Sequence, residues 1–154
     1  MKDKHLVEIE LKWKSDHIPD DPKKEKKVLK NLQPHKHLEH SSIKNYSGTK
    51  FPSWVFKNSL SNLVFLRLED CKYCLCLPPF AILSCLKTLE IIGFDGIVSI
   101  GAEFYGSNSS FASLERLHFY KMKEWKGMRM YYFFFPRLRH LSMHNCPKLK
   151  GLSE

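Results

Sequence analysis

The first chemistry that the residues suggest is metal binding by cysteine. Cys71 and Cys74 have the C-x-x-C spacing of many structural zinc sites, and two further cysteines follow closely. Tetrahedral zinc needs four converging donors, usually from two such pairs on separate turns, and only one pair is present here. We therefore expect no zinc site and, in an intracellular chain, reduced thiols at Cys71, Cys74, Cys76, Cys85 and Cys146.

Histidines form the second set of candidate ligands. His118, His140 and His144 would approach one another if the segments that carry them were neighbouring strands. A metal site there is one interpretation, but surface histidines are more often simply solvated. We predict no bound metal.

Catalytic chemistry has no support in the sequence. The chain lacks a Ser, His and Asp set at a recognisable spacing, and it lacks a glycine-rich phosphate-binding loop. It also lacks paired carboxylates in an apolar context. We expect a protein that is not an enzyme and that holds no cofactor.

Any binding residues must therefore be positioned by the repeated element that dominates the chain. The pattern of an apolar residue, two variable residues, an apolar, one variable and an apolar recurs six times, at intervals of 23 to 32 residues. Leucine-rich repeats are about 20–29 residues long. Only the unit with Ser41 in the middle apolar position departs from the pattern. The units begin at Leu6, Leu38, Leu63, Leu86, Leu114 and Leu138.

These repeats predict an α/β solenoid, specifically a leucine-rich-repeat horseshoe of about six irregular repeats. Each unit places a short strand at its second and third apolar positions, because those side chains point inward on the period-2 pleat. We expect a parallel sheet on the concave face, with loops and short helices on the convex face. Residues 1–154 then form one leucine-rich-repeat domain.

The long first interval is explained by a helix. Pro22 is preorganised for the first turn, and residues 23–32 place Val28, Leu29 and Leu32 on one apolar side.

The ninth residue of each unit shows that the array is irregular. It is a small Cys in two units, Cys71 and Cys146, but Lys14, Tyr46, Phe94 and Met122 in the others.

The ends of the array predict poor solubility. Solenoids need polar capping repeats, and neither terminus offers one. The segment Met130–Phe135 is aromatic and uncharged, and such a segment favours aggregation when it is exposed.

The variable strand residues should form a ladder on the concave face, the usual binding surface of a curved solenoid. Aromatic residues and Arg are typical anchors of protein interfaces. The alternative is an ordinary variegated surface without a partner. The candidate protein-binding residues are Phe65, Arg67, Glu69, Glu90, Ile92, Arg116, His118, Tyr120, His140 and His144, with Phe65, Ile92 and Tyr120 expected to be exposed.

The net charge of +9 suggests nucleic acid, but its distribution argues against that partner. The ladder holds four basic residues (Lys12, Lys44, Arg67, Arg116) against four acidic ones (Glu8, Glu10, Glu69, Glu90). We therefore expect no nucleic-acid partner. The longest apolar run is far too short to span a membrane, and no signal peptide is visible, so we expect a location in the cytoplasm or the nucleus.

Four segments carry motifs of one known protein family. They are Leu77-Pro78-Pro79 ahead of Leu86–Ile91, the turn Cys146-Pro147-Lys148-Leu149-Lys150-Gly151, the segment Lys50-Phe51-Pro52-Ser53-Trp54, and the stretch from Lys30 through Leu38. With these segments the chain resembles the leucine-rich repeats of plant coiled-coil nucleotide-binding (NB-ARC) disease-resistance proteins. The resemblance covers essentially the whole chain.

The resemblance implies a protein-protein interaction module of the plant immune-receptor type. Its partner would be a pathogen effector, a guarded host protein or the nucleotide-binding domain that the repeats regulate. Because the chain lacks a phosphate-binding loop, we expect a fragment without that domain. The alternatives are an intracellular adaptor of the ubiquitin-ligase substrate-binding type and a non-functional truncated remnant. The oligomeric state is not predicted.

Overall fold

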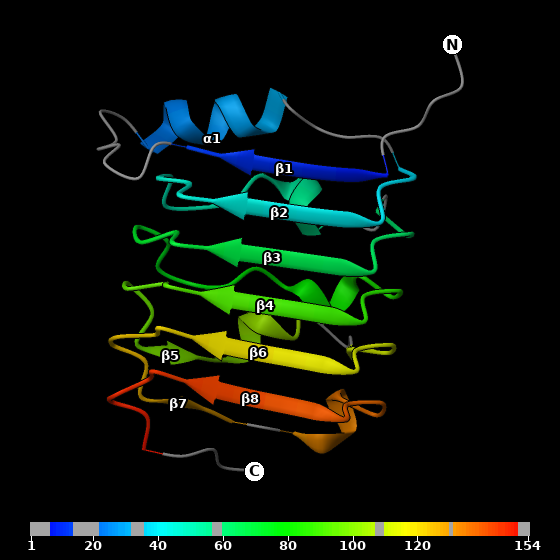
Figure 1. Cartoon of the computed structure of the whole chain (residues 1–154), viewed down its shortest axis with the longest axis vertical. Coiled ribbons are helices and arrows are strands. Elements are labelled where there is room, and N and C mark those ends of the chain that lie inside the picture. Colours follow the sequence, from blue (N-terminus) through cyan, green and yellow to red (C-terminus); the bar gives the residue numbers. More distant parts are fainter. Residues whose placement is uncertain are drawn as a thin grey trace.

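The computed structural model describes residues 7–13, 22–31, 36–56, 60–106, 110–129 and 131–150. Its main element is a six-stranded parallel sheet in the order β1-β2-β3-β4-β6-β8, stacked along the long axis of the molecule (Figure 1). Each strand starts two residues after the first apolar residue of a sequence unit, so the predicted solenoid and its strand positions are confirmed. The strands are β1 (Glu8–Lys12), β2 (His40–Lys44), β3 (Phe65–Glu69), β4 (Thr88–Ile92), β6 (Arg116–Tyr120) and β8 (His140–His144).

Adjacent strands pair so that equivalent positions of successive units face one another. Leu66 aligns with Leu89, and Leu89 aligns with Leu117. These three leucines are at most 1% exposed. A shift of one residue would turn every apolar side chain to the other face, so burial of the leucines sets the register.

A left-handed residue follows each of the last five strands of this sheet, a regularity that the sequence pattern does not reveal. Their φ angles lie between 55° and 69°. The N–H of each of the first four donates to the carbonyl of the last residue of the next strand, at 2.7 to 3.1 Å between nitrogen and oxygen. These bonds continue the sheet pairing into the turns. The five residues are Asn45, Asp70, Gly93, Lys121 and Asn145.

The ninth residue of each unit is buried where the chain leaves the sheet, even when it is large. Tyr46, Cys71, Phe94 and Met122 are all 0% exposed. Cys146 in the last unit is half-buried, and Lys14 lies outside the described residues. The solenoid therefore accommodates aromatic side chains at a position where regular repeats have a small one.

Helical turns line the side of the sheet opposite the viewer in Figure 1. Helix α1 spans Pro22–Asn31, which confirms the predicted helix and its start at Pro22. Its expected apolar side was partly wrong: Leu29 is fully buried, but Val28 is 51% exposed, and Leu32 lies outside the described residues. Within the described residues, four 3-10 turns follow: η1 (Ser53–Phe56), η2 (Phe80–Ile82), η3 (Ala102–Phe104) and η4 (Tyr132–Phe134).

A second, two-stranded parallel sheet lies behind the main one and was not expected from the sequence. Strand β5 (Ser99–Ile100) pairs with β7 (Gly127–Met128). The two strands are too short for a hydrophobic alternation to be recognised in the sequence.

Aromatic rings fill the interior near the C-terminal repeats. Phe135 is only 5% exposed, and its ring stacks on Phe111 at 5.1 Å between centroids with 6° between the planes. Within the uncharged aromatic segment Met130–Phe135, Phe133 is 71% exposed, and Met130 lies outside the described residues. This segment is therefore partly core and partly surface.

Candidate protein-binding face

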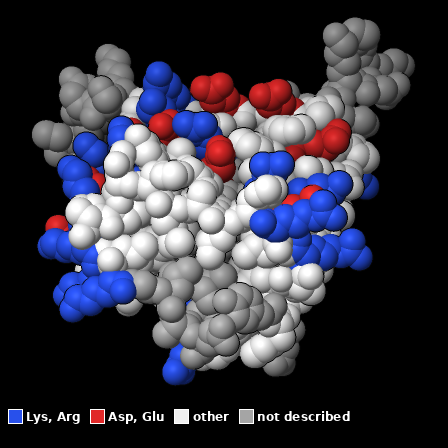
Figure 2. Space-filling model, turned by 60° about the horizontal axis from the view of Figure 1, so that its bottom comes forward, with Lys and Arg blue, Asp and Glu red and all other residues white. Residues whose placement is uncertain are grey.

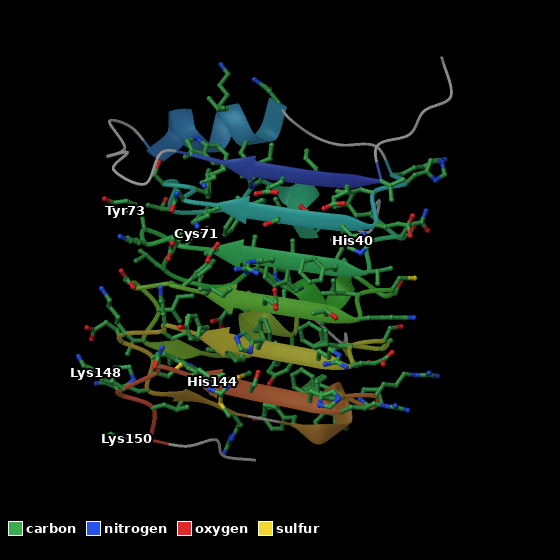
Figure 3. All side chains as sticks on the ribbon, in the orientation of Figure 1. His40, Cys71, Tyr73, His144, Lys148 and Lys150 are labelled. Atoms are coloured by element: carbon green, nitrogen blue, oxygen red, sulfur yellow. The ribbon has the colours of Figure 1, made fainter. Side chains whose placement is uncertain are left out.

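The first, third and fifth residues of the six main strands form one face, which we call the open sheet face. The strand register joins them into three rows across the sheet, and His40 and His144 mark two of its strands in Figure 3. All ten residues predicted from the sequence lie on this face. The rows are Glu8, His40, Phe65, Thr88, Arg116, His140; Glu10, Ser42, Arg67, Glu90, His118, Ser142; and Lys12, Lys44, Glu69, Ile92, Tyr120, His144.

The middle of the open sheet face carries a network of ion pairs. Lys44 Nζ lies 3.4 Å from Glu69 Oε2, and the Arg67 guanidinium lies 3.3 Å from Glu69 Oε1. Arg67 also lies 3.5 Å from Glu90 Oε1. Both cations are thus compensated by carboxylates of the same chain. Arg67 is held by two partners instead of projecting freely as an anchor.

Ile92 was expected to be exposed, and the structure shows that this expectation was wrong. Its side chain is only 5% exposed, although it occupies a position on the open sheet face. The register places it between Glu69 and Tyr120 on the adjacent strands, and strands in a sheet are only about 4.8 Å apart. The longer side chains on both sides therefore flank the shorter isoleucine. Phe65 and Tyr120 are half-buried.

Aromatic and imidazole rings gather at the C-terminal half of the open sheet face. The ring of His118 lies 5.7 Å from that of His144 and 6.1 Å from that of Tyr120, between centroids. His118 Nδ1 is hydrogen-bonded to Ser142 Oγ. His140 belongs to the first row, opposite Arg116. Among the residues that the structure describes, no group of three or more His, Cys, Asp or Glu is arranged to hold a metal ion.

The five cysteines differ in how deeply they are buried. All five are free thiols. Cys71 and Cys74 are buried, and the Cys74 thiol donates to the carbonyl of Gly48 at 3.4 Å. Burial raises the pKa of Cys74 to about 12 and raises the pKa of Cys71 well above its ordinary value. Cys76 and Cys85 are exposed, so the four thiols do not share one environment.

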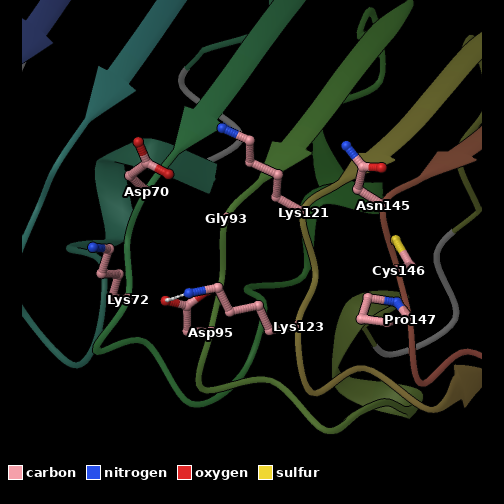
Figure 4. A pocket seen from close by; sticks show the side chains of 9 residues that line it. All are labelled: Asp70, Lys72, Gly93, Asp95, Lys121, Lys123, Asn145, Cys146 and Pro147. Atoms are coloured by element: carbon pink, nitrogen blue, oxygen red, sulfur yellow. Dashed lines mark ion pairs between the residues drawn. The ribbon is translucent and has the colours of Figure 1, made fainter.

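A groove of about 800 Å³ lies at the carboxyl ends of the strands (Figure 4). Lys123 and Asp95 form an ion pair across part of it, with 3.9 Å between Nζ and Oδ2. The ammonium group of Lys121 lies 5.5 Å from the centre of the Tyr120 ring, beside the open sheet face. Lys121 is not among the residues predicted from the sequence, because it lies in the turn after β6 and not at a strand position.

No helix in the described part of the chain is both long and apolar enough to cross a membrane.

The chain is similar to known proteins along nearly all of its length. A family model described as R13L1/DRL21 leucine-rich repeats matches residues 1–94. Over 96% of the chain, 36% of the residues are identical to the putative disease resistance RPP13-like protein 1 of Arabidopsis thaliana. Over 93% of the chain, 32% are identical to the putative disease resistance protein RGA4 of Solanum bulbocastanum. The chain spans 16% and 15% of the lengths of these two relatives. No solved structure matches.

Proposed function

Because the chain belongs to the family of R13L1/DRL21 leucine-rich repeats, we propose that it acts in plant defence by binding a protein partner through its open sheet face. The relatives are named as putative disease resistance proteins, which supports a role in defence. The finer proposal is that the face recognises a pathogen effector or a guarded host protein in the cytoplasm. Regulation of a nucleotide-binding domain through the same face is the competing outcome.

One observation carries this proposal: the face combines half-buried aromatic rings with charged side chains on rigid strands. Phe65 lies beside His40, with 5.8 Å between ring centroids, and Tyr120 lies beside His118. Rings held this way lose little conformational entropy when a partner covers them, and Tyr and Arg dominate the energetics of protein interfaces. The backbone of each inner strand is paired on both sides, so the side chains are held at fixed spacings.

The proposal is tested by site-specific photocrosslinking of the full chain in plant cells. The crosslinking amino acid benzoylphenylalanine replaces Phe65 or Tyr120 on the open sheet face. Matched controls carry it at Ile82 or Val98, which are 39% and 48% exposed outside this face.

We expect discrete crosslinked products from Phe65 and Tyr120 and none of the same size from Ile82 and Val98. Mass spectrometry of the product then distinguishes an effector, a host protein and a nucleotide-binding domain. Equal products from all four positions, or products from the two control positions alone, would contradict the proposal.

A further inference from the structure

The open sheet face is electrostatically asymmetric along the solenoid. Its four carboxylates lie on β1, β3 and β4: Glu8, Glu10, Glu69 and Glu90. Strands β6 and β8 place no carboxylate on it, and they contribute one arginine and three histidines instead. Figure 2, which brings the β8 end forward, shows a broad uncharged area below a group of acidic side chains, with mainly Lys and Arg at its margins.

The cations of the two halves differ in their pairing. Lys44 and Arg67 are already held by carboxylates of the same face. Arg116 is exposed on β6, and within the described part of the chain it forms no ion pair. Its sequence neighbour Glu115 lines a separate hollow at the amino ends of β6 and β8, together with Arg137 and Arg139.

A second uncompensated cation lies at the other end of β6. The ammonium group of Lys121 is placed over the Tyr120 ring and has no ion pair among the described residues. Arg116 and Tyr120 are four residues apart on one strand, which corresponds to about 13 Å. Two cations thus flank a strip of rings formed by His118, Tyr120 and His144.

We propose that the β6–β8 half of the open sheet face docks an extended segment of the partner with two carboxylates about four residues apart and an apolar residue between them. Arg116 and Lys121 bind the two carboxylates, and the apolar residue lies on the ring strip. The inference rests on the proposed function, since it specifies the chemistry of the partner at the same face. A carboxylate meets no competing acidic group of the face on these two strands.

The acidic half of the face strengthens this assignment. A partner segment with two carboxylates placed over β1 would meet Glu8 and Glu10, and like charges at close range repel. Over β3 and β4 it would have to displace Glu69 and Glu90 from Arg67. The β6–β8 half is thus the position on the open sheet face where such a segment gains charge-assisted hydrogen bonds without breaking existing ones.

The test is fluorescence anisotropy of the full chain with the fluorescein-labelled peptide Gly-Glu-Ser-Leu-Ser-Glu-Gly. A matched peptide with Gln in place of both Glu keeps the shape and removes the charge. We expect the acidic peptide to bind at least 10-fold more tightly than the Gln peptide, and Arg116→Ala to weaken its binding by 10-fold or more. Lys121→Ala should weaken it as well, and Lys50→Ala, the control at an exposed lysine outside the open sheet face, should leave the affinity within about 2-fold.

Equal affinity for the two peptides, or an equal effect of Arg116→Ala and Lys50→Ala, would overturn the inference. The peptide comparison needs only the unmodified chain, so it decides the matter even if a variant does not fold. A crosslink from Tyr120 together with no preference for the acidic peptide would overturn this inference and leave the proposed function unaffected. Acidic-peptide binding that depends on Arg116, without any crosslink from the face in cells, would support the inference and count against the proposed function.

Discussion

Gly93 and Asp70 occupy equivalent turns of successive repeats and lie in direct contact. A Cβ atom on Gly93 would stand 2.2 Å from Asp70 Oδ1. Gly93 also has a φ of +69°, in the left-handed region. The side chain of one turn thus fills the space that the glycine of the next leaves open, and the two repeats are matched at this point.

We predict that Gly93→Ala destabilises the solenoid. The left-handed conformation costs a residue with a Cβ about 1–2 kcal/mol, and displacement of the Asp70 carboxylate adds to this cost. Urea denaturation followed by circular dichroism measures the change. Gly101→Ala is the matched control, because Gly101 has a φ of −116° and its added Cβ would meet only the flexible end of Glu103. Equal losses for the two variants would show that the turn contact is not the cause.

We predict that Ser41→Ala stabilises the folded protein. Ser41 is 2% exposed in a row of otherwise aliphatic side chains, and among the residues that the structure describes its hydroxyl has no hydrogen-bond partner. An unsatisfied buried hydroxyl costs about 1–3 kcal/mol, so Ser41→Ala should raise the free energy of unfolding by about 1 kcal/mol. Ser42→Ala, on the opposite face of the same strand, should leave it unchanged. A lower melting temperature for Ser41→Ala would refute this prediction.

The cysteines should react with a thiol reagent in separate phases. Cys76 and Cys85 are exposed, Cys146 is half-buried, and Cys71 and Cys74 are buried. With Ellman's reagent at pH 8 we expect rapid modification of Cys76 and Cys85 and slower modification of Cys146. Cys71 and Cys74 should react only when denaturant unfolds the chain. Rapid modification of Cys71 or Cys74 in the native protein, identified by peptide mapping, would contradict the packing.

The buried thiols also predict a loss of stability at alkaline pH. The folded-state pKa of Cys74 is raised to about 12, so its stabilising effect is complete below the unfolded pKa near 9 and is lost as the pH rises towards 12. The slope is about 1.4 kcal/mol per pH unit for such a group. Between pH 9 and pH 10.5, Cys74→Ala should therefore lose about 2 kcal/mol less than the parent protein. Cys85→Ala, at an exposed position, should follow the parent; parallel curves for all three proteins would exclude the linkage.

We predict that substitutions in the aromatic segment before β8 can change the solubility and the stability of the protein separately. Phe133 is 71% exposed, whereas Phe135 is 5% exposed and stacked on Phe111. We expect Phe133→Ser to reduce concentration-dependent association in light scattering without lowering the melting temperature. Phe135→Ala should cost about 3–5 kcal/mol of folding stability. If Phe133→Ser leaves the association unchanged, the surface that causes it lies elsewhere on the molecule.

The repeat pattern was sufficient for the fold and for the composition of the open sheet face. Whether a side chain such as Arg116 or Phe65 lies on that face depends on its place within a five-residue strand, and strand alternation is a local property. The start of α1 at Pro22 is equally local, because proline is preorganised for a first helical turn. These expectations needed no knowledge of which repeats are neighbours.

The tertiary structure was needed wherever the outcome depends on a neighbouring repeat. Arg67 and Arg116 have the same alternation in sequence, but only the stacked strands bring Glu90 to Arg67 and leave Arg116 without a carboxylate partner on its face. Ile92 is buried by its neighbours on β3 and β6, and the left-handed turn of Gly93 is matched to Asp70 one repeat away. Side-chain pairing and coverage are properties of contacts between residues more than 20 positions apart, and the stacking of strands alone determines them.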